Sequence, residues 1–190
     1  MHNENYQKLK LGALASEISE RVNVPSESGY DRFVGLEHLD SGSLRVTRWG
    51  STADLVSAMK LFKKGDILFG RRNAYLKRAS IAEFDGVCSG DIIVLRSNKD
   101  IVLSEYLILI LNKENLWNYA ISYAAGSMSK RVKWRDLSKY EVTLPSLEKQ
   151  KQIADIIWSL ENEFAATMEL SYWLGQLKKS AMKKFVNTGT

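Results

Sequence analysis

Short runs of apolar and β-branched residues, separated by Gly, Ser and Asp, make up much of the first 145 residues of the chain. Runs of this kind are typical of strands, and the longer segments between them have apolar residues at helical spacing. The sequence therefore predicts an α+β domain, although the irregular order of elements does not give the sheet topology. The predicted strands are Phe33–Leu36, Leu44–Thr47, Asp66–Phe69, Ile92–Leu95 and Tyr140–Leu144, and the predicted helices are Ala13–Arg21, Ser104–Leu111 and Leu116–Ala124.

The pattern changes after Pro145, where one long amphipathic helix is predicted, with Ser146 as a suitable N-cap. From Ile153, alternating steps of four and three residues reach mostly apolar positions, which form a seam roughly 50 Å long. Such a seam predicts a coiled coil with a second helix, although its polar positions also allow packing along the helix's own domain. The predicted interface residues are Ile153, Ile157, Leu160, Phe164, Leu174 and Phe185.

Two regions follow from this change of pattern: a globular mixed-sheet domain over residues 1–145 and a long helix over residues 146–190. A chain of 190 residues that is 45% apolar can bury a sizeable core without disulfides or metals. Cys88 is the only cysteine, and the only histidines are His2 and His38, which excludes a disulfide framework and a Cys/His metal cluster. No apolar run reaches the length of a membrane span, and the first ten residues lack an apolar signal core. We therefore predict a cytoplasmic protein.

Positive charge is concentrated in two segments. Residues 60–78 contain seven Lys or Arg and one acid, and residues 130–139 contain five and one. The rest of the chain has five more acids than bases, although the whole chain has a net charge of +5. Local basic charge in an otherwise acidic chain is typical of proteins that bind phosphate polyanions, while two solvated basic faces are the alternative.

Motifs for catalysis are missing from the sequence. The chain contains no GxGxxG, GxxxxGK[ST] or GxSxG motif, and its two prolines are isolated, unlike the Pro-Pro-aromatic motif expected of an adenine methyltransferase. It also lacks the Glu-x-Lys arrangement expected of a metal-dependent nuclease. Two histidines leave little material for acid–base chemistry. We therefore predict a binding protein that is not an enzyme and has no metal site.

The segment after the predicted strand Asp66–Phe69 is dense in groups that bind nucleic acid. Arginine can donate two parallel hydrogen bonds to guanine or phosphate, asparagine can pair with adenine in the same bidentate way, and tyrosine can stack or reach a phosphate. Core packing is the alternative for the tyrosine, and surface ion pairs are the alternative for the bases. The predicted contacts to bases or phosphates are Arg71, Arg72, Asn73, Tyr75, Lys77 and Arg78.

A second predicted loop, from residue 126 to residue 135, repeats this chemistry. Glycine and serine expose backbone amides and hydroxyls to phosphate oxygens, and the bases add charge. Trp134 is interpreted as a core anchor, and a weaker basic cluster surrounds Arg45, Arg48 and Trp49 on a predicted hairpin. The predicted phosphate contacts are Ser127, Lys130, Arg131 and Lys133.

Several stretches point to one family. The most specific runs from Phe62 to Arg71 and on through Tyr75 to residues 84–89; the others are residues 9–12, residues 33–39, and residues 144–150 with Ile153. In their order along the chain, these stretches resemble the target-recognition domain and long conserved-region helix of the specificity subunit of type I restriction-modification systems. Lys149 departs from the acid that members often carry there, while Gln150 and Ile153 keep the pattern. The resemblance covers nearly the whole chain, but each motif occurs only once, so the chain is similar to one half of a subunit.

This resemblance implies a non-catalytic reader of double-stranded DNA. It also implies an adenine-N6 methyltransferase partner that uses S-adenosylmethionine and a restriction subunit that uses ATP, with no cofactor bound by this chain. Either the chain is a natural half-subunit that forms a homodimer through its helix, or it is part of a longer chain. A twofold dimer predicts a bipartite, inverted-repeat target, whereas pairing with a different half predicts an asymmetric one.

Two alternatives from other classes stay open. An RNA-binding module would use the same basic and aromatic residues and would prefer single strands. A coiled-coil interaction protein would show no salt-dependent binding of nucleic acid. The sequence does not give the bases that are read.

Overall fold

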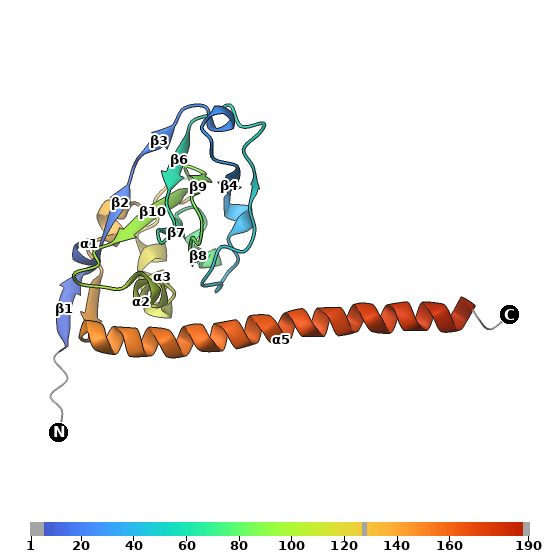
Figure 1. Cartoon of the computed structure of the whole chain (residues 1–190). Helices are drawn as coiled ribbons and strands as arrows, with labels where there is room; N and C mark the ends of the chain where they lie inside the picture. Colours follow the sequence, from blue (N-terminus) through green and yellow to red (C-terminus); the bar gives the residue numbers. More distant parts are fainter. Residues whose placement is uncertain (1–5, 127–128, 188–190) are drawn as a thin grey trace, which may run out of the picture. The chain divides into compact units, whose positions relative to one another are not determined.

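The computed structural model describes residues 6–126 and 129–187, and side chains as far as residue 183. Contacts between Cα atoms divide the chain into two units, Met1–Lys151 and Gln152–Thr190. The first unit contains the described strands, in three sheets, together with several short helices (Figure 1). Helix α5 (Leu147–Asn187) begins in this unit and forms the described part of the second. The predicted α+β class with a long C-terminal helix is confirmed.

A four-stranded antiparallel sheet supports the loops discussed below. Its order is β2–β10–β7–β8. The two inner strands, β7 and β10, contain the predicted runs of apolar residues, and these runs are completely buried. An apolar run of this length is stable as a strand because both faces of the sheet are covered. The strands are β2 (Ala15–Ile18), β7 (Ile67–Gly70), β8 (Ala79–Ile81) and β10 (Ile92–Ser97).

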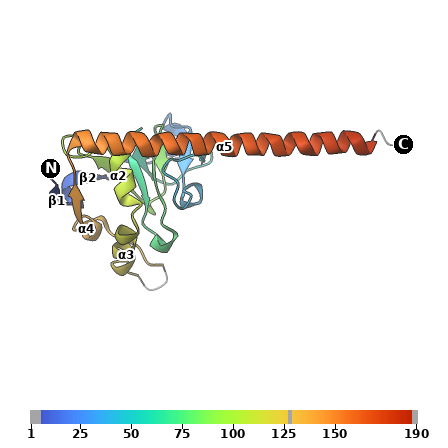
Figure 2. The ribbon, with the colours of Figure 1, turned by 90° about the horizontal axis from the view of Figure 1, so that it is seen from below.

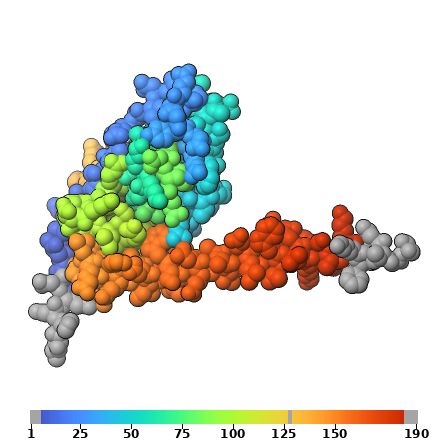
Figure 3. Space-filling model, viewed as in Figure 1, coloured from blue at the N-terminus to red at the C-terminus, as the bar shows by residue number. Residues whose placement is uncertain are grey.

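A five-stranded mixed sheet shares a core with the first. Its order is β3–β6–β9–β4–β5, and only the β4–β9 pair is parallel. Phe62 and Cys88 from this sheet pack in one cluster with Leu68 and Val94 of the other, within the closely packed body in Figure 3. Burial raises the pKa of the Cys88 thiol to about 12, so this thiol stays protonated within the core. The strands are β3 (Arg21–Val22), β4 (Arg32–Val34), β5 (Gly50–Ser51), β6 (Met59–Phe62) and β9 (Gly86–Cys88).

Two helices cover the four-stranded sheet, and both agree with the sequence prediction. Helix α2 (Ser104–Leu111) has the predicted bounds and buries most of its side chains. Helix α3 (Glu114–Ser122) begins and ends two residues before the predicted bounds. Trp117 of α3 stacks on Phe69 of β7, with 4.4 Å between the ring centroids. This stacking fixes α3 against the strand that leads into the first basic segment.

The N-terminal segment corrects one prediction. The predicted helix Ala13–Arg21 is wrong, because α1 ends after one turn (Leu11–Leu14) and the chain continues as β2 and β3. Ala15 and Ile18 pair with Ser97 and Val94 of β10. Pairing with the free edge of a buried strand outweighs a modest helix propensity, which the serines of this segment lower further. The preceding strand β1 (Gln7–Lys10) pairs with β11 (Glu141–Leu144).

The predicted strand Leu44–Thr47 is also wrong. This segment makes a single bridge, between Arg45 and Ile81, held by the backbone bonds from Val46 N to Ile81 O and from Ile81 N to Leu44 O. Leu44 and Val46 are buried, so the alternation in the sequence is real, but it serves one short contact with the edge of β8. The other four predicted strands are found as β4, β7, β10 and β11, each shifted by no more than two residues at either end.

Two side chains hold the start of α5: Ser146, directly before the helix, and Gln150, in its first turn. Ser146 Oγ accepts the backbone N–H of Lys149 at 3.3 Å, which is the predicted N-cap. Gln150 is 1% exposed and accepts the backbone N–H of Leu103 at 3.2 Å, while its amide nitrogen donates to the carbonyl of Ile101 at 3.0 Å. The first turn of α5 is therefore bonded to the segment that leads into α2.

Candidate nucleic-acid interface

The last part of the first basic segment, residues 71–78, forms a loop that closes on itself at the end of β7. We call it loop 71–78. The backbone N–H of Gly70 donates to Arg78 O at 2.8 Å, so the two ends of the loop are joined. A Cβ at position 70 would lie 3.2 Å from that carbonyl and from Leu36 Cδ2, which explains the glycine. Within the loop, η3 (Ala74–Leu76) is flanked by Asn73 and Lys77, both in the left-handed conformation.

The second basic segment lies directly against this loop. Residues 129–133 precede helix α4 (Trp134–Leu137), and Arg131 forms an antiparallel bridge with Arg72. The backbone N–H of Val132 donates to Arg71 O at 2.9 Å, and that of Asn73 donates to Lys130 O at 3.4 Å. Figure 2 shows α3, which leads towards this segment, beside loop 71–78. Two segments that are about 60 residues apart in sequence thus form one basic surface.

Asp91, at the start of β10, connects the two segments electrostatically. Its Oδ1 accepts Arg131 Nε at 2.7 Å, and its Oδ2 lies 3.4 Å from Arg72 Nη1. Its backbone carbonyl accepts the N–H of Arg71 at 3.0 Å. Burial alone would raise the pKa of the Asp91 carboxyl, but hydrogen bonds and charge from Arg131 and Arg72 lower it below its ordinary value. The carboxylate therefore stays ionised and holds two guanidinium groups side by side.

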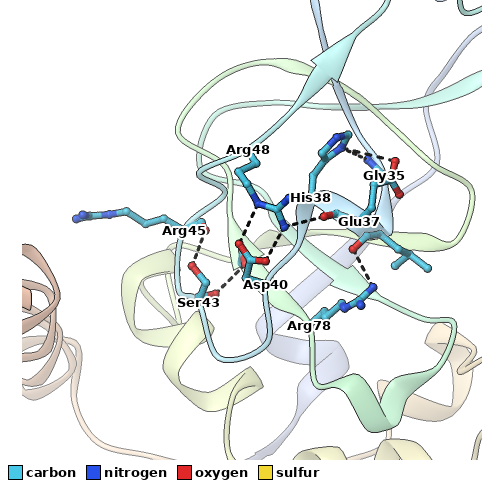
Figure 4. Close-up of polar contacts among 10 residues, drawn as sticks. Gly35, Glu37, His38, Asp40, Ser43, Arg45, Arg48 and Arg78 are labelled. Carbon is cyan, nitrogen blue, oxygen red and sulfur yellow. Dashed lines mark hydrogen bonds and ion pairs between the residues drawn. The ribbon is translucent and has the colours of Figure 1, made fainter. Parts of the chain in front are cut away.

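Two other predicted contacts in loop 71–78 have protein partners. Lys77 Nζ lies 2.7 Å from both carboxylate oxygens of Glu114 at the start of α3. Arg78 Nη1 donates to Leu36 O at 2.9 Å, in the turn η2 (Leu36–His38), as Figure 4 shows. The DNA contacts predicted for these two side chains stay predictions, and each side chain also holds the loop in place.

Tyr75 and its neighbours line a depression at the junction of the two segments. The Tyr75 side chain is 64% exposed, so it is not the core residue that the alternative interpretation proposed. The depression has a volume of about 280 Å³ and is lined by Asn73, Ala74, Tyr75, Ile121, Ala124, Ser129 and Lys130.

The remaining predicted phosphate contacts are divided between described and undescribed residues. Lys130 and Lys133 are exposed, and Arg131 is held by Asp91. Ser127 lies outside the described residues. Val132, between these bases, is completely buried and anchors the segment.

The weaker cluster around Arg48 is organised by acids and aromatic rings. Arg48 makes a two-pronged contact with Asp40, at 2.6 and 3.2 Å, and donates to Glu37 O at 2.7 Å (Figure 4). Arg45 Nε lies 3.1 Å from Glu83. The centroid of the Trp49 ring is 4.6 Å from the guanidinium carbon of Arg32, a residue outside the predicted cluster. The bond from Arg48 to the Glu37 carbonyl braces the turn η2. Among the described residues, no strand lies between η2 and β5 (Gly50–Ser51), so the predicted hairpin around Arg45 and Arg48 is not formed.

The predicted helix interface lies on α5. Ile153 and Ile157 are partly exposed, and Leu160, Phe164 and Leu174 are each more than half exposed. Phe185 lies within α5, but its side chain is outside the described ones. Pairing of this face with a second helix stays a prediction.

The described residues contain neither a metal-binding cluster nor a helix that could span a membrane. Within residues 6–126 and 129–187, no three His, Cys, Asp or Glu side chains are placed to hold a metal ion. In the same part of the chain, no helix combines the length and apolar character needed to span a membrane.

Comparison with known proteins identifies the family. The model of the type I restriction modification DNA specificity domain matches residues 37–171, which include loop 71–78, Asp91 and residues 129–133. This chain belongs to that family. The resemblance based on its motifs is thereby confirmed, and the match extends into α5.

Relatives and solved structures agree with this assignment. The chain is 24% identical to the MjaX type I restriction enzyme specificity subunit of Methanocaldococcus jannaschii, over 98% of this chain and 49% of that protein. It is 22% identical to the HindI specificity subunit of Haemophilus influenzae, over 95% and 40%. The HsdS subunit of Thermoanaerobacter tengcongensis has the same fold, with a TM-score of 0.69, 22% identity, and coverage of 87% of this chain and 44% of that one. The chain thus spans half or less of each of these proteins. These similarities give no support to the RNA-binding alternative.

Sequence reasoning missed the residues that join the two basic segments. Asp91 was missed although Gly90-Asp91-Ile92 repeats the tripeptide Gly65-Asp66-Ile67. An acid directly before a buried strand, in a chain with two basic segments, was the available signal. Ile121 and Ala124 gave no signal, because they were interpreted only as part of a helix.

Proposed function

We propose that this chain reads one part of a bipartite DNA target as half of a type I specificity subunit. The observation that carries this proposal is the joined basic surface of loop 71–78 and residues 129–133, organised around Asp91. Arginines held side by side suit guanine edges and phosphates, and the exposed lysines suit phosphates alone. Membership of the DNA specificity family supports double-stranded DNA as the ligand.

The chemistry at the target is assigned to partner subunits. An adenine-N6 methyltransferase subunit that binds S-adenosylmethionine would modify the target, and a restriction subunit that binds ATP would act through the same complex. The chain itself would be non-catalytic and would bind no cofactor, which agrees with a sequence that lacks catalytic motifs. Its role would be to position these subunits on DNA.

Helix α5 is proposed to supply the second half of the subunit. Its exposed apolar side chains suit a helix from a second copy of this chain or from a different half-subunit. The coverage of the relatives, half or less of each, is what a half-subunit or a piece of a longer subunit would give.

The experiment is to co-express this chain with its type I methyltransferase subunit and to map methylated adenines across the host genome. A bipartite motif that depends on this chain is the expected result. An inverted repeat would indicate two identical halves, and an asymmetric motif would indicate pairing with a different half. Absence of new methylation, with the methyltransferase copurifying and folded, would contradict the proposal.

A pair of variants locates the interface. Arg71→Ala with Arg72→Ala should abolish the motif and the specific gel shift at fixed salt. The matched control is Lys64→Ala with Lys99→Ala, which removes the same charge from the opposite end of the β7–β10 pair, where both residues line a separate depression. The control should keep the motif, and equal losses in both variants would contradict the assignment.

A further inference from the structure

The depression at the junction of loop 71–78 and residues 129–133 has two kinds of wall. Tyr75, Ile121 and Ala124 supply apolar surface, and Ile121 of α3 is 37% exposed although its neighbour Ala120 is completely buried. Asn73, Ser129 and Lys130 supply polar groups to the same depression. An apolar wall beside a few polar groups is the usual composition of a selective ligand site.

Two polar groups at this depression have no hydrogen-bond partner among the described residues. Ser129 Oγ is buried and makes no hydrogen bond with the described residues. The Asn73 side-chain amide likewise makes no hydrogen bond within the described part of the chain, since only its backbone N–H and carbonyl are used. Buried polar groups are normally paired, so the buried Ser129 hydroxyl indicates a place where a ligand can complete the hydrogen bonding. Asn73 is partly buried and lines the same depression, so its side-chain amide is accessible to that ligand.

Backbone hydrogen bonds hold Asn73 in a local turn. Asn73 has φ 54°, and its carbonyl accepts the N–H of Leu76 at 2.9 Å. Asparagine is one of the few side chains that adopt this conformation at little cost. The backbone that carries the amide is therefore ordered before a ligand binds, which lowers the backbone entropy lost on binding.

We propose that this depression reads one A·T base pair from the major groove, which rests on the proposed function. The Asn73 amide has one donor and one acceptor, which match N7 and the N6 amino group of adenine. The apolar wall of Tyr75, Ile121 and Ala124 receives the 5-methyl group of thymine, the only apolar group that a base pair presents in that groove. A G·C pair would set guanine O6, an acceptor, against the side-chain carbonyl oxygen of Asn73, and its cytosine would present no methyl group to the apolar wall. Lys130, at the rim, binds the adjacent phosphate.

Atom-level changes in the DNA test this proposal on the full chain in complex with its methyltransferase. Starting from a duplex with the mapped target, each thymine is replaced by uracil, which removes only the methyl group. Each adenine is separately replaced by 7-deazaadenine, which removes only the N7 acceptor. At one base pair we expect uracil to weaken binding about fivefold and 7-deazaadenine about tenfold.

Two variants assign these effects to the two walls. Ile121→Ala should reduce the uracil effect at that base pair to less than about twofold and leave the 7-deazaadenine effect. Asn73→Asp keeps the shape and tolerates the backbone conformation but cannot donate to N7, so it should remove the 7-deazaadenine effect and leave the uracil effect. Lys64→Ala with Lys99→Ala should leave both effects unchanged.

The outcomes separate this inference from the proposed function. If the complex binds its target specifically but no uracil or 7-deazaadenine substitution changes the affinity, the base-pair reading is overturned and the proposed function stands. The same holds if the variants leave both effects intact. If no DNA is bound specifically, the proposed function itself fails, and the base-pair reading fails with it.

Discussion

The two ends of the β7–β10 strand pair contain the same tripeptide and the same type of ion pair, but they differ in burial. Asp66 precedes β7, and its carboxylate is 2% exposed and accepts Arg96 at 2.8 Å through both oxygens. Asp91 precedes β10, and its carboxylate is 20% exposed and divided between Arg131 and Arg72. Because the strands are antiparallel, the two Gly-Asp-Ile tripeptides lie at opposite ends of the pair.

The difference shows that the partner, and not the tripeptide, sets the role of the acid. Arg96 belongs to β10 itself, so the ion pair with Asp66 joins two neighbouring strands, and Asp66 also accepts the backbone N–H of Lys63. The partners of Asp91 belong to loop 71–78 and residues 129–133, so that ion pair orients arginines at the surface. One end is therefore structural, and the other is the proposed reading end.

Removing the buried acid should have the largest effect. Asp66→Ala deletes the acceptor of Arg96 and of a backbone N–H, so we expect the free energy of unfolding to fall by about 3 kcal/mol. Urea unfolding followed by circular dichroism measures it. The variant should keep its target preference once folded, and a loss below about 1 kcal/mol would contradict the structural role of this end.

Removing the acid at the reading end should change discrimination more than stability. Asp91→Ala frees Arg131 and Arg72 from a fixed orientation and adds one net positive charge, which strengthens attraction to any phosphate. Preference for the target over random DNA should fall about tenfold in competition gel shifts. Asp40→Ala, which releases Arg48 elsewhere, is the control and should keep the preference. Equal losses in both variants would argue against a special role for Asp91.

Lowering the pH should weaken the contribution of Asp91 to the free energy of unfolding. The pKa of Asp91 is lower in the folded protein than its ordinary value of 3.8, so the folded state binds this proton less readily than the unfolded state. The stabilisation from the Asp91 carboxylate is therefore complete at pH values above its ordinary pKa. This stabilisation is lost as the pH falls through the pKa of Asp91 in the folded protein. The difference in unfolding free energy between the wild type and Asp91→Asn should be constant from pH 5 to 7, below about 1 kcal/mol, and should shrink below pH 4. Urea titrations at each pH measure it, and a difference that stays constant down to pH 3 would contradict the ion pair.

The smallest effect is expected at the exposed ion pair of the same loop. Glu114→Gln releases Lys77, whose pair with Glu114 is open to water, so stability should change by about 0.5 kcal/mol or less. Affinity for DNA should rise about twofold because a cation is freed. Thermal unfolding and gel shifts measure the two quantities. A loss of stability comparable to that of Asp66→Ala would contradict the distinction between buried and exposed ion pairs.

The sequence was most informative where local pattern and burial agree. The apolar runs in β7 and β10, helix α2 and the capped start of α5 could all be predicted, because the residues that determine them are neighbours in the chain. The segment after Leu14 could not, because its strand depends on pairing with β10, about 80 residues away.

The candidate site shows the same limit. The basic residues of loop 71–78 and of residues 130–133 were identified from their chemistry, but the sequence could not show that the two segments adjoin. That contact consists of backbone bonds, such as Val132 N to Arg71 O, which leave no mark on residue type. The roles of Ile121 and Ala124 were hidden for the same reason, because an apolar residue on a helix is equally suited to a core.

The backbone bonds between loop 71–78 and residues 129–133 have a consequence for how such proteins change. Since the loops are joined through main-chain N–H and C=O groups, the side chains at positions 71, 72 and 130 can be replaced without removing those bonds. The main-chain bonds that hold the two loops together are thus independent of the side chains that would contact DNA. A few substitutions at these positions give a protein engineer, or natural divergence, a route to a new DNA target on an unchanged fold.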